Sequence, residues 1–447
     1  MGKKEDSEEG LREKTRRLSV KEAGFYSIHD GFGLRYITPY ALEIGKNNPY
    51  TNTYIGLLTS VPSLVSNLSQ IWTSRLMEKY SRKTLVKTGV LLQSLMWLGI
   101  IFTGICFFLF GMNSNLAMIM LLLFYTLLVW SGAMISPVWT SWMKDIVTKD
   151  QGKYFGNRNK VLGIVALATM LIGGLVLDYF KPIQVFIGFA ALFFIAFMAR
   201  GYSGLLFKKY YEPELKLSKG YYFSFKDFVK KLPTSNYAKF SLFVALIMFA
   251  TSVASPFFSV YMLKNLGFNY TLWISTVVLT LLGQILFVPS WGKFIDKYGP
   301  IKAMKISGAL IPFIPLVWLF TPLMVNNPYI LFPYLFVEEF ASGVIWAGFN
   351  LSASNFIYSA VTRERVGICS AYYNVLQGFG VFIGATIGGM IASQSFSFLG
   401  LNEILFVFMI SGILRGIIYF VMISKIKEVN PVQEFDSKKI FKKIVKR

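Results

Sequence analysis

Long apolar runs, rather than amphipathic segments, fill most of this chain of 447 residues. A helix that crosses the hydrocarbon core of a bilayer, about 30 Å thick, needs roughly 20 mostly apolar residues. Only 15% of the residues are charged, against about 25% in soluble proteins. The sequence therefore predicts an all-α polytopic membrane protein with twelve transmembrane helices, near residues 24–44, 53–74, 84–110, 115–142, 160–180, 182–206, 237–262, 271–291, 303–325, 328–358, 368–392 and 402–424.

The basic residues are distributed unevenly between the two sides of this arrangement. If the first span starts inside, 39 of the 45 Lys and Arg residues fall in the termini and in the connections after even-numbered spans. Only Lys46, Lys181 and Lys264 stand on the other side. This distribution follows the positive-inside rule and predicts a multi-pass protein of the cell membrane with both termini cytoplasmic. Because the basic residues are scattered over seven segments, they indicate contact with lipid headgroups and no nucleic-acid partner.

The two halves of the chain repeat each other. Glu78 and Lys79, in a charged turn after the second span, match Asp296 and Lys297 at an offset of 218 residues. Segments 152–177 and 367–392 share their glycine and asparagine positions at an offset of 215. The sequence thus predicts two parallel six-helix repeats. The expected organisation is a cytoplasmic N-terminal tail 1–22, a six-helix half 23–206, a central cytoplasmic loop 207–235, a second six-helix half 236–425 and a basic cytoplasmic tail 426–447.

The duplicated turn carries a glycine, an acid four residues later, basic residues and a second glycine. The second half has Gly292, Asp296, Lys297, Gly299 and Lys302, and the first half has Glu78, Lys79, Arg82 and Lys83 with Ser74 and Ser81 in the glycine positions. With twelve spans in two repeats, nearly the whole chain resembles the major facilitator superfamily. The resemblance implies that these charged turns form a cytoplasmic gate, which biases one of two rocking states. A solvated turn that only fixes topology is the other interpretation.

Ionisable side chains inside a membrane span cost roughly 2.5–3.5 kcal/mol each on insertion scales, so each is a candidate for function. By the resemblance, spans 1, 4, 7 and 10 line the central cavity of the family. The candidates for substrate binding and proton coupling there are Asp30, Arg35, Glu339, Trp346 and Asn350. Asp30 and Arg35 would lie about 140° apart on a regular helix, so we expect them on different faces. Asp30 alternatively caps or gates the cytoplasmic end of its helix.

The tenth span also carries two adjacent acids, Glu338 and Glu339. Glu339, Trp346 and Asn350 lie along one face of this helix, whereas Glu338 lies about 100° away from that face. Arg415 in the twelfth span lies at a similar depth, which predicts a structural ion pair between Glu338 and Arg415. His29, the single histidine, is expected at an interface rather than as a proton carrier.

These expectations describe a secondary active transporter that moves a small organic solute by alternating access, with Glu339 loading and releasing a proton. The aromatic content of 17% suits an amphipathic solute, while Arg35 would accept a carboxylate. A transporter-like solute sensor, or a lipid-moving protein of the same fold, is the alternative. The sequence has no ATP-binding P-loop, and its two cysteines exclude a disulfide framework. We therefore expect no enzymatic activity, no cofactor, no metal site and a functional monomer in the bilayer.

Overall fold

The computed structural model describes residues 8–214, 225–231, 234–362, 365–398 and 400–433. Parts of the predicted N-terminal tail, central loop and C-terminal tail lie outside these residues. The first half of the chain forms α1 (Glu8–Phe32), η1 (Leu34–Tyr36), α2 (Ile37–Ile44), α3 (Thr51–Lys79), α4 (Arg82–Gly104), η2 (Ile105–Leu109), α5 (Ser114–Ile146) and α6 (Gln151–Phe207).

The short helix α7 (Phe225–Lys230) lies in the connection between the halves. The second half forms α8 (Asn236–Ala254), α9 (Phe257–Val260), η3 (Tyr261–Asn265), α10 (Tyr270–Tyr298), α11 (Pro300–Leu310), α12 (Phe313–Val317), η4 (Trp318–Leu323), α13 (Pro328–Ala360), α14 (Val366–Ala392), β1 (Ser397–Phe398), β2 (Leu401–Asn402), α15 (Glu403–Met422) and η5 (Ile423–Lys425). The two strands pair as a small antiparallel ribbon beside α15.

Nine helical segments of the described residues are long and apolar enough to cross a membrane. One of them, α6, has 57 residues and holds two spans, because the backbone leaves helical geometry at Gln184, just after Pro182. The two predicted spans outside this set, 24–44 and 53–74, are nevertheless helical, as α1 with η1 and α2, and as α3. The twelve predicted spans therefore all occur as helices, and several of them extend beyond the predicted limits.

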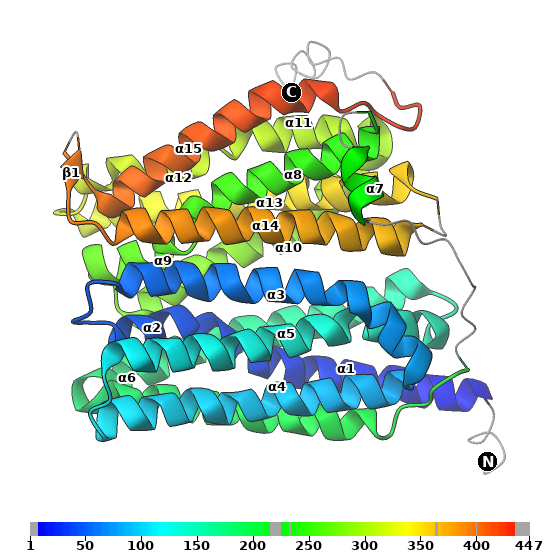
Figure 1. Ribbon diagram of the computed structural model, residues 1–447, viewed down its shortest axis with the longest axis horizontal. Coiled ribbons are helices and arrows are strands. Elements are labelled where there is room, and N and C mark those ends of the chain that lie inside the picture. Colours follow the sequence, from blue (N-terminus) through cyan, green and yellow to red (C-terminus); the bar gives the residue numbers. More distant parts are fainter. Residues whose placement is uncertain (1–7, 215–224, 232–233, 363–364, 399, 434–447) are drawn as a thin grey trace.

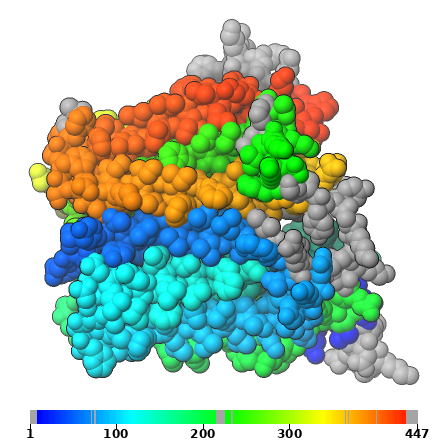
Figure 2. Space-filling view, viewed as in Figure 1, coloured from blue at the N-terminus to red at the C-terminus, as the bar shows by residue number. Residues whose placement is uncertain are grey.

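The helices form two layers that run the length of the molecule (Figure 1), α1–α6 in one and α8–α15 in the other. Along the boundary, α3 lies against α14 and α6 lies against α10. Figure 2 shows α3 and α14 side by side across this boundary. The all-α architecture of two parallel six-helix repeats is confirmed.

Within the second half, a row of glycines brings α14 close to α8. A Cβ atom added at Gly380, Gly384 or Gly388 would lie 2.1–2.3 Å from a backbone carbonyl oxygen of α8. Glycine is needed here because any side chain would hold the two backbones apart. Small residues spaced four apart are typical of membrane helices that pack closely.

The two ends of the bundle differ in how the halves are joined. We name the end with the Lys79–Arg82 and Tyr298–Pro300 turns the charged end, and the opposite end the distal end. At the distal end, one core cluster contains side chains of both halves, such as Tyr36 and Trp273, whose rings are 5.7 Å apart. Towards the charged end, the described residues form two separate core clusters, one in each half. The halves thus share a core at the distal end and have separate cores towards the charged end, where α3 and α14 stay in contact through the hydrogen bond of 2.9 Å from Asn374 to Gln70.

Candidate functional site

The first span breaks near its middle, and the break brings Asp30 and Arg35 together. The helix α1 ends at Phe32, and the backbone at Gly33 has φ −103° and ψ −81° before η1 begins. A side chain at Gly33 would lie 2.4 Å from the ring of Trp97, so the turn requires glycine. Arg35 reaches back across the break, and its Nε and Nη2 lie 3.2 and 3.1 Å from Oδ2 of Asp30.

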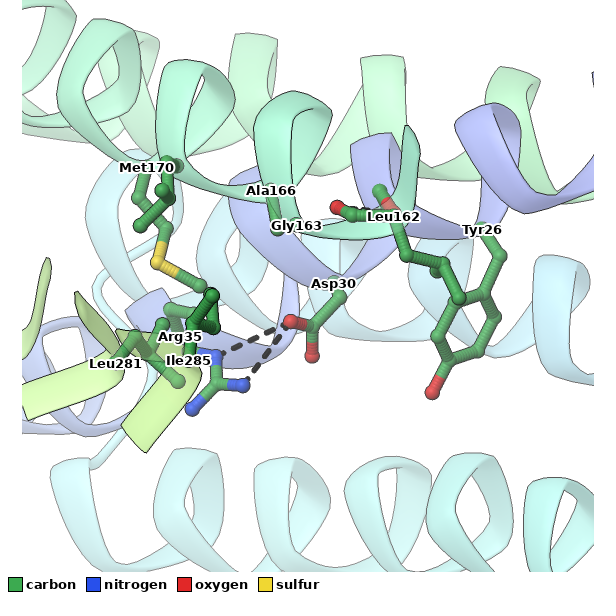
Figure 3. A pocket seen from close by; sticks show the side chains of 11 residues that line it. Tyr26, Asp30, Arg35, Leu162, Gly163, Ala166, Met170, Leu281 and Ile285 are labelled. Carbon is green, nitrogen blue, oxygen red and sulfur yellow. Dashed lines mark hydrogen bonds and ion pairs between the residues drawn. The ribbon is translucent and has the colours of Figure 1, made fainter. Parts of the chain in front are cut away.

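The expectation of different faces for Asp30 and Arg35 is therefore wrong, because it assumed a regular helix through Gly33. The ion pair is partly exposed, with side-chain exposures of 17% for Asp30 and 38% for Arg35. It lines a cavity of about 190 Å³ (Figure 3) together with apolar residues of α6 and α10, among them Met170, Leu281 and Ile285. Because α6 and α10 belong to different halves, this cavity lies between the two repeats.

The three candidates on α13 lie elsewhere. Glu339 accepts a hydrogen bond from the hydroxyl of Thr280 on α10. The ring of Trp346 lies 5.7 Å from that of Phe349 and packs on the core of the second half, whereas Asn350 is exposed. Neither the cavity at Asp30 nor the larger one described below is lined by these three residues.

The predicted ion pair between Glu338 and Arg415 does not form among the described residues. The buried guanidinium of Arg415 donates to the carbonyl of Ile311 at 3.2 Å and to that of Thr251 at 3.4 Å. The carbonyl of Ile311 lacks its usual helical donor because Pro315, four residues later, has no N–H. Arg415 is thus used to satisfy backbone carbonyls, and both buried oxygens of Glu338 lack a hydrogen-bond partner in the structure.

The charged turn of the first half is held by an acid and by backbone carbonyls that the sequence motif did not reveal. Arg82 is buried, and its Nη1 lies 2.6 Å from Asp145 at the end of α5. Its Nη2 donates to the carbonyl of Pro213 at 2.8 Å. Lys83 donates to the carbonyl of Tyr210 at 2.9 Å. Glu78 and Lys79 are exposed.

In the second half, the backbone of Gly299 has φ +84°, a conformation that favours glycine. A Cβ there would also lie 2.4 Å from the carboxylate of Glu428, which accepts the N–H of Ile301 at 2.9 Å. Asp296 and Lys297 are exposed. The hydrogen bonds of Arg82, Lys83 and the N–H of Ile301 reach residues of their own half or of the chain directly after it.

At the distal end, polar contacts do cross between the halves. Asp178 of α6 accepts the backbone N–H groups of Tyr270 and Thr271, both at 2.8 Å, at the start of α10. The hydroxyl of Tyr270 donates to Glu43 at 2.5 Å. Thr53 and Ser393 pair through their hydroxyls at 2.8 Å. We call these three pairings the distal contacts. The sequence pointed to none of them, because each joins residues far apart in the chain.

A buried charge cluster inside the first half was also missed. Glu22, Arg158 and Arg200 come from α1 and the two arms of α6, and each is less than one tenth exposed. The arginines line a second cavity, of about 440 Å³, with Tyr26 and Trp139. His29 is fully buried nearby and accepts a hydrogen bond from the indole of Trp97 at 2.8 Å. An arginine within an apolar run, as at 200, is the signal that could have found the cluster.

Comparison with known proteins places this architecture in a family. The sequence profile of the Major Facilitator Superfamily matches residues 27–385 and 240–446. A protein of Lactococcus lactis subsp. lactis (strain IL1403), described as a multi-drug resistance efflux pump PmrA homolog, is 24% identical over 395 residues, which cover 84% of this chain and 88% of that protein. Two solved structures share the fold: a D-xylose-proton symporter (TM-score 0.70, 12% identity, 94% of this chain and 99% of that one) and the nucleoside transporter NupG (TM-score 0.67, 14% identity, 93% and 99%). The chain therefore belongs to the Major Facilitator Superfamily.

Proposed function

We propose that this protein is a proton-coupled secondary transporter, which moves a small organic solute across the cell membrane by alternating access. The observation that carries the proposal is the Asp30–Arg35 ion pair, which lines a cavity between the two repeats. Transporters built from repeats place substrate and ion sites near the middle of the membrane, at the repeat interface. A carboxylate and a guanidinium at this position offer a partner to a charged group of either sign.

The walls of this cavity favour an amphipathic solute. Apart from the ion pair, its lining includes Met170, Leu281 and Ile285, which make no hydrogen bonds through their side chains. A sugar or a nucleoside would need several convergent hydrogen-bonding groups, because buried polar groups without partners are costly. The description of the Lactococcus relative as a multi-drug efflux pump supports the same class of solute.

We assign proton coupling to Glu339, with Glu338 beside it. Glu339 receives one hydrogen bond, from Thr280, and neither acid forms an ion pair with a described residue. Adjacent carboxyl groups inside a membrane bundle that form no ion pair with a basic side chain are suited to hold and release a proton. The D-xylose-proton symporter of the same fold is coupled to protons by its description.

The charged end is the proposed cytoplasmic mouth, by the positive-inside distribution. Its gate would comprise Glu78, Lys79, Arg82 and Lys83 in the first half and Gly292, Asp296, Lys297, Gly299 and Lys302 in the second. Separate core clusters in the two halves at this end, and the distal contacts at the other, describe one of the two states that alternating access requires. The second state would close the charged end and break the distal contacts.

The proposal is tested by flux in proteoliposomes that enclose a pH-sensitive dye. With a solute panel of ethidium, benzoate, xylose and uridine, we expect one solute class to cause proton movement and to be transported. Glu339→Gln should abolish the coupled proton movement, and Arg35→Ala should abolish transport. Glu403→Gln, which removes an acid from the first turn of α15, is the matched control and should leave both intact.

Solute movement without a proton signal would reject proton coupling and retain transport. Binding of a solute without any flux would instead identify a transporter-like solute sensor, and lipid transfer in the same liposomes would identify a lipid-moving protein.

A further inference from the structure

The buried charges of the first half do not balance. Glu22 accepts from Nη2 of Arg158 at 3.1 Å, from Nη1 of Arg200 at 3.3 Å and from the hydroxyl of Ser203 at 2.7 Å. One carboxylate thus serves two guanidinium groups, which leaves an excess of one positive charge. An unbalanced buried charge is costly, so an anion would stabilise this cluster.

Each arginine keeps one terminal nitrogen available. Arg158 uses Nε for Ser19 at 3.3 Å and Nη2 for Glu22, while its Nη1 makes no hydrogen bond to a described residue. Arg200 uses Nε for Gln93 at 2.6 Å and Nη1 for Glu22 and Ser203, and its Nη2 is likewise without a partner in the described chain. Two guanidinium nitrogens from two arms of α6 are the donors that a carboxylate or a phosphate accepts.

Aromatic rings hold both guanidinium groups in place. The guanidinium carbon of Arg158 lies 4.4 Å from the ring centre of Trp139, and that of Arg200 lies 5.2 Å from the ring centre of Tyr26. Such cation–π contacts fix the orientation of the donors before a ligand arrives. All four side chains line the same cavity.

The cavity has the size and lining of an organic ligand site. Its volume of about 440 Å³ lies within the ~300–1,000 Å³ range of small-molecule pockets and exceeds what an inorganic anion needs. Apolar residues of α5, including Leu128, Val129 and Ile135, also line this cavity. It shares Tyr26 and Leu162 with the cavity at Asp30, whose charge is already paired with Arg35.

We propose that this cavity, lined by residues of α1, α4, α5 and α6 of the first half, binds an organic anion whose carboxylate or phosphate lies between Arg158 and Arg200. This site goes beyond the proposed transport function, because it belongs to one half alone and its occupancy requires no proton gradient. The anionic group belongs either to a soluble solute or to a lipid headgroup, and the two sources share the same recognition chemistry.

The test is isothermal titration calorimetry on the full-length protein in nanodiscs. The probes are naphthalene-2-carboxylate and naphthyl phosphate, with the uncharged naphthalene-2-carboxamide as the isosteric control. We expect the two anions to bind and the carboxamide to bind at least about tenfold more weakly, since it loses a charge-assisted hydrogen bond. Equal binding of all three would overturn the proposal.

Variants of the cluster separate binding from folding. Arg158→Gln should weaken the carboxylate at least about tenfold, whereas Glu22→Gln, which frees donors and raises the positive charge, should tighten it. Arg12→Gln also removes one positive charge, but from a position on α1 outside the cavity, and it should leave the affinity for the probes unchanged. If Arg158→Gln and Glu22→Gln both lower the melting temperature and leave probe affinity unchanged, the cluster is structural and the site proposal is wrong.

The lipid composition of the nanodisc identifies the source of the anion. If phosphatidylglycerol competes with the probe and phosphatidylcholine alone does not, a lipid phosphate occupies the arginine site. If probe affinity is the same in both lipids, the site takes soluble anions. Either result supports an anion site, whereas absence of anion binding in both lipids overturns it.

Discussion

Gly33 decides which charges of the first span meet. The sequence identified Asp30 and Arg35 as exceptional residues because of their depth, and both line the cavity between the halves. Their pairing could not be predicted, because it depends on the helix break that the ring of Trp97 and the backbone at Gly33 impose together. The same limit applies to Arg415. Its partners are backbone carbonyls, one of which lacks a helical donor because of Pro315. Every residue has a backbone carbonyl, so such partners cannot be recognised from residue type.

The substitution Asp30→Asn is expected to reduce solute transport strongly while lowering the stability of the fold only slightly. The ion pair is partly exposed, so its loss should cost no more than about 1 kcal/mol of folding free energy. Solute flux should nevertheless fall strongly, because Arg35 loses the partner that positions it in the cavity. Melting temperature and proteoliposome flux are measured on the same preparation. A large loss of stability with normal flux per folded molecule would assign the pair to structure instead.

The helices themselves were predictable, because apolar runs of sufficient length have few alternatives in a bilayer. This holds for α6 as well, because its backbone leaves helical geometry at Gln184, close to the predicted boundary between its two spans. The spacing of Gly380, Gly384 and Gly388 is typical of a close helix contact, but it does not identify α8 as the partner.

Gly384→Ala is expected to destabilise the second half. The new Cβ would lie 2.1 Å from the carbonyl oxygen of Phe249, a backbone atom that cannot move aside alone. Overpacking of this kind costs typically about 1–3 kcal/mol. Gly152→Ala is the matched control: it also lies in a helix, but nothing stands within 4 Å of its added Cβ. Thermal unfolding should show a lower melting temperature for the first substitution, and an equal or higher one for the second.

For the whole molecule, the internal repeat predicted two halves, and the structure has them. How the halves meet was beyond the sequence, because the distal contacts join positions such as Thr53 and Ser393, 340 residues apart. The partners of the charged turns, at the opposite end of the bundle, could not be predicted either. Their motif was visible, but the acids that bind Arg82 and the N–H of Ile301 are Asp145 and Glu428, which lie outside it.

Covalent closure of the distal end should stop transport. In a variant without Cys106 and Cys369, the pair Thr53→Cys and Ser393→Cys replaces two hydroxyls that are 2.8 Å apart on α3 and α14. Oxidation should form a disulfide and block solute flux, and a reductant should restore it.

The control pair is Asn48→Cys with Asn115→Cys, whose side chains also meet at 2.8 Å at the distal end but within one half. Its disulfide should leave flux unchanged. Normal flux with the Thr53–Ser393 cross-link in place would mean that this end need not open.

The bond between Asp178 and α10 has a consequence for mutational tolerance. Its donors are main-chain N–H groups, which every residue except proline supplies at 270 and 271. In a saturation scan, position 271 should therefore accept most residues and reject proline. Position 178 should be far more selective, because one side chain there must accept two hydrogen bonds at once. Selection would act on a single side of this contact, and position 271 would be free to drift in sequence while the two halves still close, whereas Tyr270 would be retained for its hydrogen bond to Glu43.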